Sequence, residues 1–355
     1  MEYRTLGGSG IKVSHFCLGA MMFGAWGNTD HDECVRIIHA ALDAGVNFID
    51  TSDAYSSGES EQILAKALRG RRENVVLATK CFFPPGRAGQ FTREGASVNN
   101  GGGSRRWIVR AVEASLQRLD TDYIDVYQLH RRDWDTDLEE SLAAMTDLQR
   151  AGKIRVIGTS ATPAEWIVEA QHIAEKRQLA RVRSEQCIYS ILSRGIEVSV
   201  LPTCQRYGVG TMVYAPLAAG WLSGKYRRHE PLPAGSRAAG RLGQMLGVWN
   251  EERPEVQRKY VLVEELSMLA REAGHSLTHM AMAFAAEHPA VSSVIMGPRT
   301  MEQIQDTLAA AELRLAPEVL DRLDAIVPPG TRVDPKDSLI PNPWLDEPAR
   351  RRRPR

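Results

Sequence analysis

The sequence of 355 residues predicts an α/β fold, a single (β/α)8 TIM barrel with an N-terminal hairpin and long loops over its C-terminal face. Short apolar, β-branched runs alternate with stretches of helical periodicity, which is the pattern of a parallel sheet built from repeated βα units. Eight such runs occur, and the first of them recur at intervals of about 30 residues, the length of one unit. Because no proline-rich or low-complexity linker divides the chain, one closed barrel explains the order better than two domains.

The expected elements follow in chain order. A hairpin is expected at residues 3–13, where four residues at 7–10 form a glycine-rich turn, and it would close the floor of the barrel. The expected strands are residues 14–18, 47–50, 75–80, 124–130, 154–160, 184–188, 210–214 and 293–296. The amphipathic helices between them include residues 32–44, 59–68, 105–119, 138–151 and 163–176.

Two long segments, residues 82–103 and 226–253, interrupt this rhythm. Both follow expected strands, so both are expected over the same end of the barrel. Loops of this length within a compact domain are functional lids or disordered segments. We assign residues 1–345 to the barrel and residues 346–355, an arginine-rich end, to a basic, disordered tail.

The composition argues against several classes of partner. The 44 basic residues balance 44 acidic ones, so no net charge favours nucleic acid or an anionic membrane surface. The N-terminus lacks the pattern of a secretory signal, and no apolar run approaches the roughly 20 residues of a membrane span, so a cytoplasmic protein is expected. The five cysteines contain no CxxC pair and are expected to be reduced and mostly buried.

The polar residues that end the strands define a candidate site, because the carboxyl ends of barrel strands meet at one mouth. Asp50, Lys80 and His130 end the second, third and fourth expected strands, and Tyr55 lies in the loop after Asp50. A buried Lys80 is costly without a carboxylate, which Asp50 on the adjacent strand supplies. Taken alone, this pair fits a structural salt bridge equally well, and a lone His130 fits a core histidine.

Tyr55 changes this interpretation, because a tyrosine near a lysine can act as an acid. The pKa of a free phenol is near 10, and a neighbouring ammonium lowers it by stabilising the phenolate. We therefore expect Tyr55 to donate a proton and Lys80 to lower the pKa of its hydroxyl. Asp50 would keep Lys80 charged, and His130 would orient a substrate carbonyl.

Two sequence motifs carry a resemblance to a known family. The first is FIDTSDAY at residues 48–55, followed by GESE at residues 58–61. The second contains SL, RL and YID between residues 115 and 125 and leads to QLH at residues 128–130. In this order they resemble the signatures of the aldo-keto reductases, and the resemblance extends from about residue 3 to about residue 329. It implies a catalytic tetrad, which consists of Asp50, Tyr55, Lys80 and His130.

The resemblance also implies a nicotinamide cofactor at the barrel mouth. No GxGxxG motif of a Rossmann fold follows an expected strand, which agrees with this mode of binding. Arg299 suits a 2′-phosphate, so NADPH is expected rather than NADH. The residues that the resemblance assigns to the cofactor are Ser160, Gln186, Tyr214, Pro216, Leu217, Gly220, Ser223, Gly224, Lys225, Gly297, Arg299, Gln303 and Asp306.

The family match divides the cofactor among these residues. It implies that Tyr214 stacks on the nicotinamide ring and that Ser160 and Gln186 bind the carboxamide. Residues 216–225 would lie against the pyrophosphate, and the residues from Gly297 onward would hold the adenosine end. The sequence departs from the family pattern where it carries Ser56, Ala161 and Thr307. None of these departures touches the tetrad.

The substrate is expected to be a small carbonyl compound. Phe23, Trp26 and Trp134 lie in loops after strands and either line an apolar substrate pocket or pack against their own scaffold. No metal is expected, since His275 and His279 share a helix face without the glutamate of a zinc protease. The oligomeric state stays open.

The sequence thus predicts an oxidoreductase, an NADP-dependent aldo-keto reductase that reduces an aldehyde or ketone to an alcohol with Tyr55 as general acid. Two alternatives remain open. One is a partner subunit that senses the cofactor and turns over slowly, as some barrels of this family do. The other is an aldolase that uses Lys80 as a Schiff-base nucleophile, although this gives Tyr214 and the segment after Gly297 no role.

Overall fold

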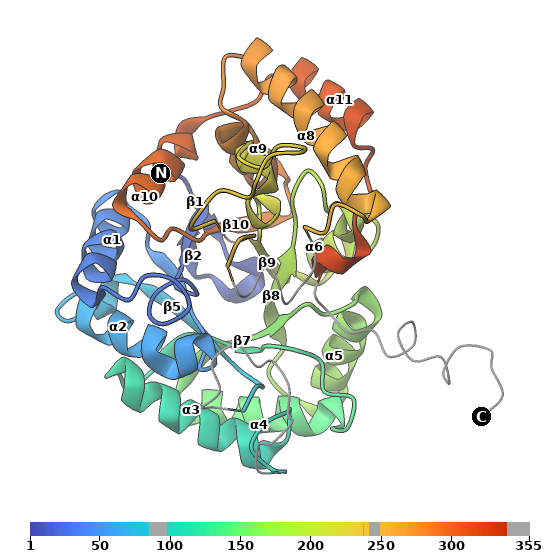
Figure 1. Ribbon diagram of the computed structural model, residues 1–355. Coiled ribbons are helices and arrows are strands. Elements are labelled where there is room, and N and C mark those ends of the chain that lie inside the picture. Colours follow the sequence, from blue (N-terminus) through green and yellow to red (C-terminus); the bar gives the residue numbers. More distant parts are fainter. Residues whose placement is uncertain (85–97, 237, 241–248, 339–355) are drawn as a thin grey trace.

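The computed structural model describes residues 1–84, 98–236, 238–240 and 249–338, and Figure 1 shows how their helices and strands are arranged. The remaining positions include most of the expected loop at residues 82–103, part of the loop at 226–253, and the expected basic tail. The predictions for residues 82–103 and for the tail therefore lie largely outside the described residues, whereas most of the segment at residues 226–253 is described.

Eight parallel strands form a closed barrel, which confirms the expected TIM-barrel fold. Their order around the barrel is β10-β3-β4-β5-β6-β7-β8-β9, so each strand pairs with its neighbour in sequence and the last closes on the first. The strands are β3 (Phe16–Gly19), β4 (Phe48–Asp50), β5 (Val76–Cys81), β6 (Ile124–Leu129), β7 (Ile154–Ser160), β8 (Val182–Ile188), β9 (Gly210–Tyr214) and β10 (Val291–Met296).

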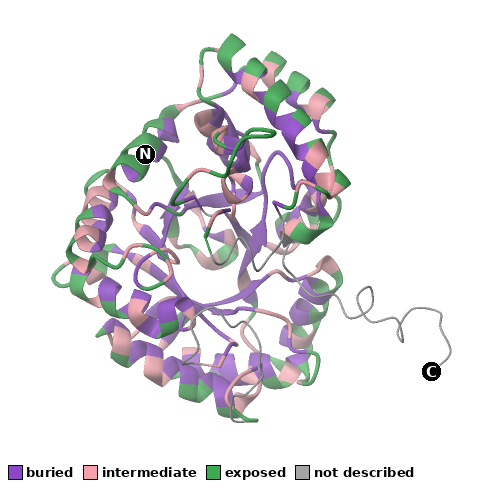
Figure 2. Ribbon diagram, viewed as in Figure 1, coloured by how far each residue is buried: buried purple, intermediate pink, exposed green. Residues whose placement is uncertain are grey.

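Helices surround the barrel and turn their apolar faces toward it, as the buried inner faces in Figure 2 show. Side chains of Asp30, Ser104, Ser276 and Thr300 cap the first turns of four of them. The helices are α1 (His31–Asp43), α2 (Glu59–Ala67), α3 (Arg105–Leu119), α4 (Leu138–Arg150), α5 (Ala164–Arg177), α6 (Val200–Tyr207), α8 (Pro254–Glu272), α9 (Leu277–Glu287), α10 (Met301–Ala309) and α11 (Pro317–Ile326).

The N-terminal hairpin closes one end of the barrel, as expected. β1 (Tyr3–Thr5) pairs antiparallel with β2 (Lys12–Ser14), and Leu6 between them is fully buried in a cluster of side chains from the barrel strands. Gly7 lies against the first residue of β9, where an added Cβ atom would be only 2.4 Å from the backbone nitrogen of Gly210. The hairpin therefore plugs the amino end of the strands and leaves the carboxyl end as the mouth.

The sequence misplaced one boundary in this region. The expected strand at residues 14–18 is two elements, because Ser14 ends β2 of the hairpin and the barrel strand begins only at Phe16. His15 separates them: its backbone N–H donates to the carbonyl of Glu2, and its ring bonds the carbonyl of Ala311 at 2.9 Å. A single run in the sequence thus contains the end of one strand and the start of another.

The other expectations for the chain can be compared with the described residues. All five cysteines lie in the described part, and each is a buried free thiol. None of the helices in this part has the length and apolar character that a membrane-spanning helix needs.

Candidate active site

Three neighbouring strands bring the expected catalytic residues together at the barrel mouth. Asp50 ends β4, Lys80 lies near the end of β5, and His130 follows β6 directly. The backbone pairing continues past the strand ends, since the N–H of Asp53 donates to the carbonyl of Lys80 and that of His130 to the carbonyl of Cys81. These bonds fix the loop that leads to Tyr55 against the neighbouring strand.

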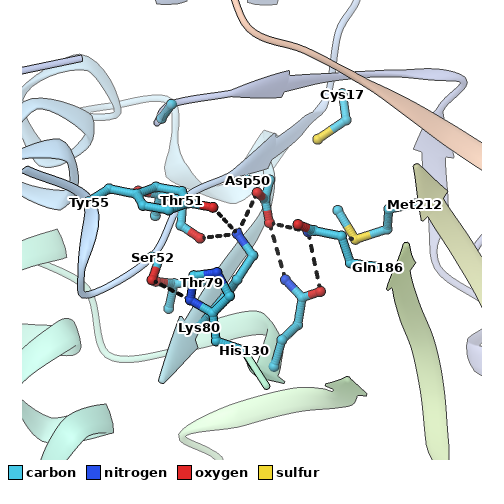
Figure 3. A network of polar contacts seen from close by, with 12 residues as sticks. Cys17, Asp50, Thr51, Ser52, Tyr55, Thr79, Lys80, His130, Gln186 and Met212 are labelled. Carbon is cyan, nitrogen blue, oxygen red and sulfur yellow. Dashed lines mark hydrogen bonds and ion pairs between the residues drawn. The ribbon is translucent and has the colours of Figure 1, made fainter. Parts of the chain in front are cut away.

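Lys80 is the centre of the site and is completely buried (Figure 3). Its Nζ donates to Asp50 Oδ2 at 2.6 Å, to the carbonyl of Thr51 at 2.7 Å and to the Tyr55 hydroxyl at 3.1 Å. These three acceptors use all the donors of an ammonium. Burial acts to lower the pKa of Lys80, but the Asp50 carboxylate and the Tyr55 hydroxyl together outweigh it and the pKa is raised, so Lys80 is charged.

The Asp50 carboxylate is held on its other side by two amides. Oδ1 accepts from Gln128 Nε2 at 3.1 Å and from Gln186 Nε2 at 2.8 Å. The sequence did not single out Gln128, although its position two residues before His130 on β6 places it on the same face of the strand. Gln186, expected to bind the nicotinamide carboxamide, already uses its side-chain nitrogen to orient Asp50.

Tyr55 begins the short 3-10 turn η2 (Tyr55–Gly58), whose next two residues, Ser56 and Ser57, have left-handed φ angles of 48° and 58°. Burial raises the pKa of Tyr55, and the opposing effect of the Lys80 charge is smaller. This corrects the expectation that Lys80 brings the pKa below that of a free phenol. The hydroxyl of Tyr55 is therefore protonated, which is the form that a proton donor needs.

His130 lies beside Tyr55, with 5.8 Å between the two ring centroids and an edge-on arrangement. Burial lowers the pKa of His130 well below its usual value, so the imidazole is neutral. Its Nδ1 bonds the hydroxyl of Ser52 at 3.2 Å, and Nε2 has no hydrogen-bond partner among the described residues. Ser52 is a further residue that the sequence analysis missed.

The residues expected at the nicotinamide end lie on the strands that follow β6 around the mouth. Ser160 ends β7, and the Ala161 that follows it has a left-handed φ of 59°. Tyr214 ends β9, and its buried hydroxyl has no hydrogen-bond partner in the described part of the chain. Burial raises the pKa of Tyr214 to about 12. An orphaned polar atom at this position is compatible with an added ligand.

The expected pyrophosphate segment forms a strained turn after β9. It contains Pro216, Leu217, Ser223 and Gly224 and is centred on the 3-10 turn η5 (Ala218–Ser223). Three alanines, at positions 215, 218 and 219, have φ angles of 57°, 47° and 57°. A left-handed conformation costs an alanine about 1–2 kcal/mol, and such strain gathers at ligand clamps.

Gly220 lies within this turn, and its lack of a side chain leaves room for the ammonium of Lys225. An added Cβ atom at Gly220, where φ is 98°, would lie 3.2 Å from Lys225 Nζ. The ammonium of Lys225 thus lies directly against the turn, close to backbone that the family match assigns to the pyrophosphate. The donor set of this segment fits an anionic group.

The segment expected at the adenosine end begins after β10. Gly297 has open space where a Cβ atom would be, and the N–H of Arg299 donates to Gln303 Oε1 at 2.8 Å. The guanidinium of Arg299 forms no ion pair with any described residue, which suits a phosphate ligand. The carboxylate of Asp306, in contrast, already bonds His279 Nε2 at 2.9 Å.

The three aromatic residues proposed for the substrate pocket differ in position. Phe23 has no exposed surface and belongs to the hydrophobic core, which favours the scaffold interpretation. Trp26 packs against Tyr55, with 5.8 Å between the ring centroids. Trp134 is 41% exposed and stacks on the guanidinium of Arg132, whose Cζ lies 3.7 Å from the ring centroid. Only Trp26 contacts the tetrad.

No group of three or more metal-binding side chains lies close together within the described residues. The histidine pair considered in the sequence, His275 and His279, forms no such group, because His279 bonds Asp306 instead.

Comparison with known proteins adds a family match to this geometry. The Aldo/keto reductase family matches residues 15–328. The chain is 37% identical over 338 residues to "Uncharacterized oxidoreductase YrpG" of Bacillus subtilis, which covers 92% of this chain and 96% of that protein. It is 37% identical over 334 residues to "Probable voltage-gated potassium channel subunit beta" of Oryza sativa, with 92% and 97% coverage. It is 33% identical over 339 residues to "Versiconal hemiacetal acetate reductase" of Aspergillus parasiticus, with 91% and 96% coverage.

Proposed function

This chain belongs to the aldo/keto reductase family, and we propose that it reduces an aldehyde or ketone to an alcohol with NADPH, using Tyr55 as the proton donor. One observation carries the proposal: the Tyr55 hydroxyl accepts a hydrogen bond at 3.1 Å from a buried, charged Lys80 at the open end of the barrel. The family and its oxidoreductase relatives support carbonyl reduction in general.

The chemistry that NADPH would supply when bound is hydride transfer to the carbonyl carbon, while the protein would supply the proton. Tyr55 is protonated before the reaction because burial raises its pKa. As the carbonyl oxygen gains charge, the phenolic proton moves to it. The phenolate that remains lies next to the Lys80 ammonium, which stabilises it. General acid help of this kind contributes about 10²- to 10⁴-fold in rate.

The other two members of the tetrad position these groups. Asp50 binds Lys80 at 2.6 Å and keeps it charged in a site from which water is excluded. His130 is neutral, and with Ser52 bound to Nδ1 its Nε2 is the ring nitrogen left for a substrate oxygen. A hydrogen bond from Nε2 would fix the carbonyl at the angle that both transfers need.

We propose NADPH rather than NADH because of the residues that follow β9 and β10 at the barrel mouth. The guanidinium of Arg299, which forms no ion pair with a described residue, suits a 2′-phosphate, and the strained turn at residues 215–220 with Lys225 beside it suits the pyrophosphate. Tyr214 and Ser160 would complete the cofactor-binding site near the nicotinamide. Free, buried cysteines fit a reducing compartment, and we place the reaction in the cytoplasm.

The test follows NADPH absorbance with a panel of aldehydes and ketones, comparing the native chain with Tyr55→Phe. We expect the native chain to consume NADPH, and the variant to lose about 10²-fold or more in kcat/KM while it binds NADPH with unchanged affinity. Undiminished turnover in Tyr55→Phe would contradict the role of Tyr55.

A second candidate function is that of a partner subunit that senses the cofactor. It is favoured by the relatives named as potassium channel β subunits, which are 35–37% identical to this chain. Tight NADPH binding without reduction of any carbonyl in the panel would support it over the reductase. Borohydride trapping of a substrate on Lys80 would instead indicate the aldolase.

A further inference from the structure

Arg131 occupies a position at the mouth that the tetrad does not use. It follows His130 directly after β6 and is partly buried. One of its terminal nitrogens donates to the backbone carbonyl of His130 at 2.6 Å. Its Cζ lies 5.9 Å from the ring centroid of Phe83, and that ring lies 5.0 Å from the His130 ring. The guanidinium is therefore held beside the catalytic imidazole.

Arg131 has no acidic partner in the part of the chain that the structure describes. Four other shielded arginines each form a short ion pair, with 2.6–2.9 Å between the charged atoms: Arg72 with Asp125, Arg118 with Glu61, Arg194 with Glu197 and Arg253 with Asp334. The acidic residue nearest in sequence, Asp133, accepts instead from the N–H of Gly103 and the hydroxyl of Thr136. Arg131 thus keeps donors that no described residue uses and that are partly shielded from water.

The charge of Arg131 also reaches the catalytic groups. Burial decides the direction of the pKa shift at Tyr55 and at His130, raising the first and lowering the second. The positive charge of Arg131 acts on both in addition, and it acts on Tyr214 across the mouth as well. An anion bound to Arg131 would therefore lie close to the point where Tyr55 and His130 meet a carbonyl oxygen.

We propose that Arg131 binds a carboxylate of the substrate, so that the enzyme prefers aldehydes or ketones that also carry a carboxylate. A planar guanidinium pairs with a carboxylate through two parallel hydrogen bonds, and one such pair matches one negative charge. The neighbouring Arg132 offers no second cation for a dianion, because it is sandwiched between the rings of Trp134 and Trp166. This inference rests on the proposed carbonyl reduction, whose substrate class it defines.

The cofactor is a less suitable source for this anion. The cofactor phosphates are assigned to Arg299 after β10 and to the turn after β9. In the barrel order β10-β3-β4-β5-β6, Arg131 follows the strand that lies four positions from β10, on the opposite side of the mouth. An anion held by Arg131 therefore belongs with the substrate side.

The experiment compares 4-carboxybenzaldehyde with its methyl ester, which has the same ring and aldehyde but no charge. For the native chain we expect a higher kcat/KM for the acid. In Arg131→Met the ratio of acid to ester should fall roughly ten- to hundredfold, the range for hydrogen bonds to a charged group. Arg131→Lys keeps the charge but loses the planar fork, so it should recover part of the ratio.

Arg132→Met is the matched control, since it removes an arginine from the same loop and should leave the ratio of acid to ester as in the native chain. A ratio that does not change in Arg131→Met would overturn the proposal. An increased KM for NADPH with a constant ratio would also overturn it, and would assign Arg131 to the cofactor.

A binding measurement separates failure of this inference from failure of the reductase proposal. Calorimetry would compare 4-(hydroxymethyl)benzoate and its methyl ester, each added to the protein with NADP⁺. Tighter binding of the acid that depends on Arg131, without turnover of any aldehyde, would support the anion site and contradict the reductase. Turnover of the aldehydes without any preference for the acid, in rate or in binding, would support the reductase and contradict the anion site.

Discussion

The two sides of the barrel mouth differ in how completely their polar groups are paired. On the side of β4, β5 and β6, the ammonium of Lys80 has three acceptors and Asp50 has three donors. On the side of β9 and β10, three alanines are left-handed. Among the described residues, the buried Tyr214 hydroxyl has no hydrogen-bond partner and Arg299 forms no ion pair. The fold thus satisfies the buried ion pair of Lys80 and Asp50 by itself, whereas the side of β9 and β10 retains groups that a ligand can complete.

The largest effect on this comparison is expected from Lys80→Met, which breaks the paired side. It leaves the Asp50 carboxylate buried with only two amide donors, and loss of one partner from a buried ion pair costs about 3–5 kcal/mol. Urea unfolding should show this decrease in the free energy of unfolding. The double variant Lys80→Met/Asp50→Asn should recover part of it, and a double variant as unstable as the single one would argue against the pairing.

Glu185 offers a sharper test, because it is a buried carboxylate that pairs with no cation in the described part of the chain. It accepts from the Thr159 hydroxyl at 2.5 Å and from the N–H of Thr162 at 2.9 Å. Burial raises its pKa to about 7. Since the folded-state pKa lies above the unfolded value near 4.5, stability is greatest below pH 4.5 as far as this group is concerned, and roughly 3 kcal/mol is lost as the pH rises to and beyond 7.

The measurement for Glu185 is the free energy of unfolding between pH 5 and 8 in the native chain and in Glu185→Gln. The glutamine does not titrate, so its profile should lack this part of the decrease with pH. Parallel profiles for the two proteins would mean that Glu185 ionises normally.

Arg299→Leu tests the unpaired side, with a smaller expected effect. If Arg299 binds the 2′-phosphate, the dissociation constant of NADPH should rise roughly ten- to hundredfold, as for loss of a charge-assisted hydrogen bond. NADH lacks that phosphate, so its dissociation constant should change much less. Both are measured from quenching of protein fluorescence. Equal weakening of the two cofactors would place Arg299 elsewhere.

The smallest effect is expected from Tyr214→Phe, which removes a buried hydroxyl that has no partner among the described residues. Because nothing is lost from a hydrogen bond, the free energy of unfolding should stay the same or rise by up to about 1 kcal/mol. The same substitution at Tyr55 removes an acceptor of Lys80 and should destabilise. Thermal unfolding of the two variants compares the two sides directly, and a less stable Tyr214→Phe would show that its hydroxyl is paired.

Much of the fold and the tetrad could be predicted, because both depend on local patterns. Two expected strands, β7 and β9, have the predicted bounds. Each is a largely apolar run, and the flanking residues do not continue its pattern. The tetrad followed from polar residues at the ends of three adjacent strands. A barrel turns such positions in sequence into neighbours in space.

The polar partners of the tetrad could not be predicted, because they depend on contacts between distant residues. Gln128 lies in an apolar strand and binds Asp50, which is 78 residues away. Ser52 contacts His130 across the same separation. The pKa direction of Tyr55 was also missed, since the charge of Lys80 is visible in the sequence but the depth of burial is not. Phe23 was considered as a loop aromatic but is a core residue, and its depth of burial is likewise not visible in the sequence.

The N-terminal plug has a consequence for the order in which the chain folds. Gly7 of the hairpin fits against β9, and Arg4 donates to the backbone of Ala286, 282 residues later. The hairpin therefore cannot dock until β9 and α9 have been made. Contacts of such long sequence separation form slowly, and the amino ends of the first strands stay exposed on the ribosome in the meantime. Docking of the hairpin is therefore expected to be a late step of folding.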